Sequence, residues 1–145
     1  MSSTDSHPDQ QHITYVGKHE VTYDTDDLMV IRVHGNISVD DARGLALAER
    51  KIWANNVAVY LLVIVDKTVS IDSGLLGEIK SLYAGRPPHL SALVGASFTL
   101  QTVGSVINRA LRMLGRPSSL RFFKDEADAR AWFDEERARR AAPDA

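Results

Sequence analysis

The stretch Ala58-Val-Tyr-Leu-Leu-Val-Ile-Val65 decides the fold, because this unbroken apolar run ends directly at a charged residue, Asp66. An apolar run of this length is typical of a strand that is buried on both faces of a sheet. Such strands lie at the centre of sheets that helices cover. We therefore predict that residues 59–65 form the most buried strand and pair in parallel with the next apolar segment, residues 90–96.

Upstream of this strand, the sequence predicts a hairpin followed by a helix. Residues 19–23 and 28–34 are rich in β-branched and apolar residues, and an Asp-rich turn joins them. Ser38 precedes two acidic residues, Asp40 and Asp41, which is the pattern of a helix N-cap and first turn. Apolar residues then recur at helical spacing until the Asn-Asn pair at 55–56.

Downstream, helices and strands alternate. Helical spacing covers residues 75–83 and 101–114, residues 120–123 form a short strand, and a last helix opens at Asp125. The fold class is α/β: a mixed four- to five-stranded sheet with an N-terminal hairpin and flanking helices. We expect a disordered leader over residues 1–12, one domain over 13–134, and a charged, frayed tail over 135–145.

Composition narrows the possible functions. The chain has no cysteine, which excludes disulfides and thiol chemistry. Its N-terminus lacks the order of a signal peptide, so we expect a cytoplasmic protein. The histidines are scattered, and no hydrolase or phosphate-loop motif occurs. We therefore expect no catalytic residues, no metal, no cofactor and no nucleic-acid partner.

Charge is distributed unevenly along the chain. No acidic residue lies between positions 79 and 124, whereas Lys and Arg recur throughout this segment. Arg109, Arg112 and Arg116 are three to four residues apart and share one helical face. They are candidates for contact with an anionic partner or lipid; the alternative is an ordinary solvated face.

The segment after the central strand is the most informative for function. Asp66 ends the strand at the edge where α/β folds usually build their sites. Asp72, Ser73 and Gly74 then open a helix, whose free N–H groups attract anions and would stabilise a phosphate on Ser73. The alternative is that Asp72 or Ser73 only caps the helix.

The run Ile-Asp-Ser-Gly-Leu at 71–75 resembles the Asp-Ser-Ser-Gly-Leu signature of STAS domains, although Gly74 follows a single serine here. Residues 111–115, followed by Phe122 and Phe123, resemble the helix, Leu…Gly turn and final strand of the same family. Residues 123–133 resemble the closing segment of its SpoIIAA-like branch. The resemblance covers about residues 18–134. It implies a regulatory protein-binding module similar to an anti-sigma-factor antagonist, with a kinase or anti-sigma-like partner. Its contact surface would lie within residues 67–83; the candidate binding residues are Asp66, Asp72, Ser73, Gly74 and Leu75, with Ser73 as the phospho-acceptor.

Two other functions stay open. The SpoIIAA-like fold is related to lipid-binding CRAL-TRIO domains, which implies a binder of a small apolar ligand or a membrane lipid. In that case residues 100–114 form a movable helix over a pocket, and the basic residues face anionic headgroups at a membrane surface. The third reading is an enzyme that uses Asp66 and Asp72.

Overall fold

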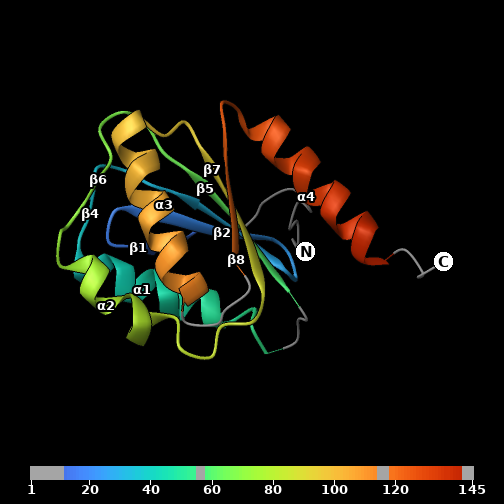
Figure 1. The fold of residues 1–145 in the computed structure, drawn as a ribbon, viewed down its shortest axis with the longest axis horizontal. Helices are drawn as coiled ribbons and strands as arrows, with labels where there is room; N and C mark the ends of the chain where they lie inside the picture. The colour runs from blue at the N-terminus through green and yellow to red at the C-terminus, as the bar shows by residue number, and fades with distance from the viewer. Residues whose placement is uncertain (1–11, 55–57, 114–117, 142–145) are drawn as a thin grey trace, which may run out of the picture.

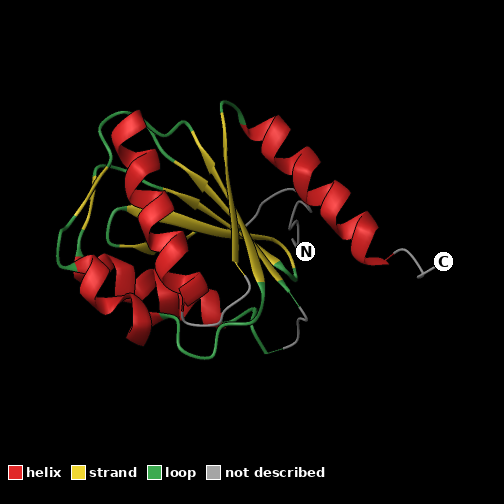
Figure 2. Ribbon diagram, viewed as in Figure 1, coloured by secondary structure: helices red, strands yellow, loops and turns green. Residues whose placement is uncertain are grey.

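A six-stranded sheet forms the middle layer of the protein within residues 12–54, 58–113 and 118–141, which the computed structural model describes (Figures 1 and 2). The strand order is β1-β2-β3-β5-β7-β8. The pairs β1/β2 and β2/β3 are antiparallel, and β3, β5, β7 and β8 run parallel. In chain order the elements are β1 (Thr14–Val16), β2 (His19–Thr25), β3 (Leu28–Arg32), β4 (Asn36–Ile37), α1 (Val39–Arg50), β5 (Val59–Ile64), β6 (Ser70–Ile71), α2 (Leu75–Leu82), β7 (His89–Val94), α3 (Phe98–Met113), β8 (Ser118–Phe123) and α4 (Glu126–Ala141).

The predicted central strand is confirmed. β5 lies between β3 and β7 and pairs in parallel with both, with Val59 opposite His89 and Ile64 opposite Val94. Its first four residues are buried, because apolar side chains alternate toward helices on both faces of the sheet. The expectation that this strand is the most buried one is not confirmed, because five of the six residues of β7 are buried, against four of six in β5.

The helices α1, α2 and α3 cover one face of the sheet, and α4 covers the other (Figure 1). The connections β3-α1-β5, β5-α2-β7 and β7-α3-β8 all step across the sheet in one direction. Because crossovers between parallel strands are right-handed, these steps place α1, α2 and α3 on the same side. Trp132 and Phe133 of α4 pack against the opposite face, beside Tyr60 and Leu62.

The sheet is larger than expected. The sequence predicted four to five strands, but β1 adds a strand at the edge next to β2, and its three residues are too few to show a pattern. A separate pair, β4 and β6, links the loop after β3 to the loop after β5. Its strands are two residues long, and the Asn36 side chain bonds to Ser70 and Asp72 beside them.

The helix boundaries confirm one expected cap and correct another. Ser38 caps α1 in a capping box, in which the Ser38 hydroxyl accepts from the Asp41 N–H and the Asp41 carboxylate accepts from the Ser38 N–H. The expectation that Asp72 or Ser73 caps α2 is wrong, because Gly74 occupies the N-cap and no side chain bonds there. Asp72 turns instead to the Asn36 amide.

The last helix, α4, ends later in the chain than expected. Residues 135–141, which were expected to form a charged tail, continue α4, and residues 142–145 of that tail lie outside the described part of the chain. Arg137 of this segment donates to both Asp27 carboxylate oxygens and stacks on the Tyr60 ring, which ties the helix end to the sheet. Except for His12, the expected leader lies outside the described residues. No helix of the described part of the chain is long and apolar enough to cross a membrane.

Candidate functional site

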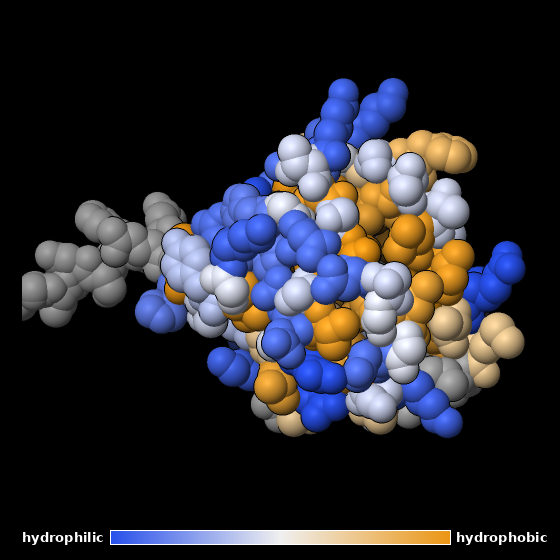
Figure 3. Space-filling model, turned by 90° about the vertical axis from the view of Figure 1, so that its left-hand side faces the viewer, coloured by the Kyte–Doolittle hydropathy of each residue, from blue (hydrophilic) through white to orange (hydrophobic). Residues whose placement is uncertain are grey.

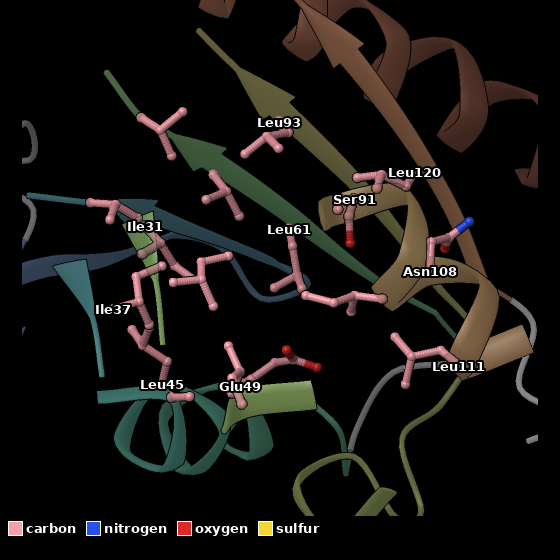
Figure 4. A pocket seen from close by; sticks show the side chains of 18 of the residues that line it. Ile31, Ile37, Leu45, Glu49, Leu61, Ser91, Leu93, Asn108, Leu111 and Leu120 are labelled. Atoms are coloured by element: carbon pink, nitrogen blue, oxygen red, sulfur yellow. The ribbon is translucent and has the colours of Figure 1, made fainter. Parts of the chain in front are cut away.

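An apolar cavity of about 190 Å³ lies between the sheet and the helices α1, α2 and α3 (Figure 4). Its walls come from β3, β5, β7 and β8 of the large sheet, from the small pair β4 and β6, and from these three helices, and it is partly open to solvent. Figure 3 shows a continuous apolar area, bordered by hydrophilic side chains, on the side of the molecule where β6, α2 and α3 lie. Apolar residues that line the cavity include Ile31, Ile37, Leu45, Leu61, Val63, Leu93, Leu100, Ile107 and Leu111.

The arrangement of the helices explains why this space stays open. On the far face, α4 approaches β5, β7 and β8 closely. On the cavity face, α3 approaches the edge strand β8, while α1 and α2 pack on each other. The middle of the sheet, where Leu61 of β5 and Leu93 of β7 point toward the helices, is therefore only partly filled (Figure 4). Voids of this size are uncommon because protein interiors are close-packed.

One part of the cavity wall is polar and charged. The Arg86 guanidinium donates from Nε to Glu49 Oε2 at 2.6 Å and from Nη2 to Oε1 at 2.9 Å. Its Nη1 lies 2.9 Å from Nε2 of His89, and Trp53 Nε1 donates to Glu49 Oε2 at 2.7 Å. Glu49, Arg86 and His89 are all buried and all line the cavity.

The turn after α2 brings Arg86 into the interior. Gly85 has a φ of 82°, in the left-handed region that favours glycine, so the chain reverses directly after the helix. Arg86 then folds back over the Tyr83 ring, with its guanidinium carbon 4.5 Å from the ring centroid. Residues Pro87 and Pro88 lead into β7, which starts with His89.

The cluster is close to electrically neutral. Burial raises the pKa of the Glu49 carboxyl, and the Arg86 guanidinium opposes this effect. Three N–H donors point at this carboxyl group, which favours the ionised form. Because Arg86 always donates, His89 Nε2 must accept, so the ring is neutral. Burial and the charge of Arg86 lower the pKa of His89 to about 3.

Ser91 is a polar residue in the apolar wall itself. It lies on β7 opposite Leu61 of β5 and Leu120 of β8, on the same side of the strand as His89 and Leu93. Its hydroxyl points into the cavity (Figure 4). Within the described part of the chain, the structure records no hydrogen-bond partner for this hydroxyl.

The residues predicted as a partner-binding site lie around the start of α2. Asp66 is exposed and accepts from the backbone N–H and the hydroxyl of Thr68, which lowers the pKa of its carboxyl group. Ser73 and Gly74 are exposed, next to Asp72. Leu75, in contrast, is buried in the core between α1 and α2, so its side chain is not available to a partner.

The predicted basic face lies on α3. Arg109 and Arg112 are exposed on this helix, and Arg116 lies outside the described residues. α3 contains no acidic residue. Two large apolar side chains are exposed at its ends: Phe98 has an exposed fraction of 84% and Met113 of 81%. The outward face is therefore both basic and apolar.

Comparison of the chain with protein-family models, with curated proteins and with solved structures finds no match. Nor do the described residues contain a group of three His, Asp or Glu side chains that could hold a metal ion.

Sequence reasoning missed the cavity cluster. Glu49 and Arg86 are 37 positions apart, and each on its own is an ordinary surface type of residue. One signal was present: Glu49 lies beside Ala48 and on the same helical face as Leu45 and Ile52, which are positions that face a core. A charge at such a position needs a buried partner.

Proposed function

We propose that this protein binds a small apolar or amphipathic molecule in the cavity between the sheet and α1, α2 and α3. The observation that carries the proposal is the cavity of about 190 Å³ with mainly apolar walls and access from solvent. An apolar cavity of about 150 Å³ stays dry and binds benzene. The ligand is therefore a molecule somewhat larger than benzene, or the hydrocarbon end of a longer chain that leaves through the opening.

The test fills the cavity without disturbing the opposite face. Val63 and Ile64 are neighbours on β5, and their side chains point to opposite sides of the sheet. Val63→Phe should reduce binding of toluene at least tenfold, because the ring occupies the cavity, whereas Ile64→Phe should leave binding within about twofold of the wild type. Calorimetric titration measures both. Equal binding by all three proteins would contradict the proposal.

The fold that supports this function is of the STAS or SpoIIAA-like type in our proposal. Two features support this proposal. The elements follow the order of a hairpin and then alternating helices and strands, and residues 71–75 run from the end of β6 to the start of α2. We place the protein in the cytoplasm, with contact to a membrane surface through α3.

A second candidate function is regulated protein binding at the start of α2. The observation that favours it is the exposure of Ser73 and Gly74. The segment just before them is fixed, because the Asn36 side chain of β4 bonds to both Ser70 and Asp72. Residues next to a helix N-terminus can carry a phosphate without loss of the fold. Ser73 is the phospho-acceptor in this proposal, and a kinase or anti-sigma-like protein is the partner.

A further inference from the structure

Ser91 is an unusual residue type for a cavity wall that serves only to fill the core. Its neighbours across the sheet on both sides are leucines, Leu61 and Leu120, and Leu93 follows it on the same face. Leu, Ile and Val fill such positions in the covered face of a parallel sheet. A serine there leaves space beside the strand and adds a hydroxyl group to an apolar surface.

That hydroxyl has a cost unless a ligand or water binds it. The backbone groups of β7 next to Ser91 are used in the pairings with β5 and β8. Removing a hydroxyl from water without a new hydrogen bond is unfavourable. Ser91 therefore provides one donor and one acceptor to whatever occupies the cavity.

The charges around this position are already balanced. Glu49 and Arg86 form a two-point ion pair, and His89 is neutral because its Nε2 accepts from Arg86. A ligand carboxylate or ammonium in the cavity would lose its hydration and gain no opposite charge of its own.

We propose that the cavity selects uncharged amphipathic molecules, with a single hydroxyl or carbonyl group hydrogen-bonded to Ser91 and hydrocarbon against the leucine and isoleucine walls. This inference rests on the proposed ligand-binding function and names the chemical class of its ligand. Ser91 sets the specificity, while the apolar walls supply most of the affinity.

The experiment compares three small probes by calorimetric titration at pH 7.5: toluene, 1-hexanol and hexanoate. Wild-type protein should bind toluene and 1-hexanol, and hexanoate at least tenfold more weakly than 1-hexanol. Ser91→Ala should weaken 1-hexanol binding roughly three- to tenfold, which is the effect of one neutral hydrogen bond, and leave toluene binding within about twofold. Ser81→Ala, at an exposed position on α2, is the matched control and should change neither.

The outcomes separate the two proposals. Toluene binding that survives in Ser91→Ala shows that the variant is folded and its cavity intact. If Ser91→Ala then binds 1-hexanol as the wild type does, or if hexanoate binds as tightly as 1-hexanol, the selectivity inference is overturned while apolar binding stands. If no probe binds to wild-type protein, the proposed function fails, and the inference with it.

Discussion

Arg86 holds both carboxylate oxygens of Glu49 inside the protein, at 2.6 and 2.9 Å, where the two side chains have exposed fractions of only 3% and 2%. The pair joins α1 to the turn before β7, and it forms part of the cavity wall. The two hydrogen bonds compensate both charges for their loss of hydration. If one partner is removed, the other remains as an uncompensated buried charge.

Glu49→Gln should therefore strongly destabilise the protein. The substitution leaves Arg86 charged and buried, so we expect the free energy of unfolding to fall by about 3–5 kcal/mol. Urea unfolding measures the change. The control is Glu78→Gln, which breaks the exposed pair with Arg43 at 2.9 Å and should cost less than about 1 kcal/mol. If both variants lost a similar amount of the free energy of unfolding, the buried pair would matter no more to stability than the exposed one.

Stability should depend on pH through His89. The folded protein lowers the pKa of His89 from 6.5 to about 3, so below pH 6.5 the unfolded chain binds a proton that the folded protein does not. The contribution of His89 to the free energy of unfolding is fully present above pH 6.5. It falls by about 1.4 kcal/mol per pH unit as the pH drops toward 3. Between pH 7.5 and 5.5, wild-type protein should lose about 1.4 kcal/mol more than His89→Gln in urea unfolding. Parallel pH dependence in both proteins would contradict this.

Ser73 should tolerate a negative charge without loss of stability. Ser73 is exposed and caps no helix, so Ser73→Ala and Ser73→Asp should each change the free energy of unfolding by less than about 0.5 kcal/mol. If the start of α2 is the partner surface, Ser73→Asp should lose a partner that wild-type protein and Ser73→Ala both retain, because the partner would bury an unpaired charge. Cross-linking in cells followed by mass spectrometry tests this. Ser81→Asp, exposed further along α2, is the control and should keep the partner.

The outward face of α3 should bind anionic membranes. Arg109 and Arg112 supply the charge attraction, and the exposed Phe98 and Met113 can enter the lipid interface. We expect sedimentation with vesicles that contain phosphatidylserine at 50 mM salt and release at 500 mM salt. Arg109→Gln with Arg112→Gln should reduce the bound fraction several-fold. A double substitution of the exposed Lys51 and Lys67 to Gln is matched in charge and should have little effect. Equal binding to neutral vesicles would show that the arginines are only a solvated face.

The local elements of this protein could be predicted from the sequence. The apolar run of β5, its parallel partner β7 and the Ser38 cap of α1 follow from residue periodicity and capping chemistry, which act over a few neighbouring residues. The exposed positions of Ser73, Arg109 and Arg112 also follow from such patterns.

What the sequence by itself determined is which segments form strands and helices, and in what order they alternate. Only the tertiary structure decided the edge strand β1, the continuation of α4 to Ala141, and the cavity with Glu49, Arg86 and Ser91 in its wall. The physical reason is distance along the chain. The end of α4 is held by a residue far from it in sequence, since Asp27 accepts from Arg137. β1 pairs with its neighbour β2, but its three residues are too few to show a strand pattern. The cavity exists because α3 lies near β8 and the middle of the sheet is only partly filled.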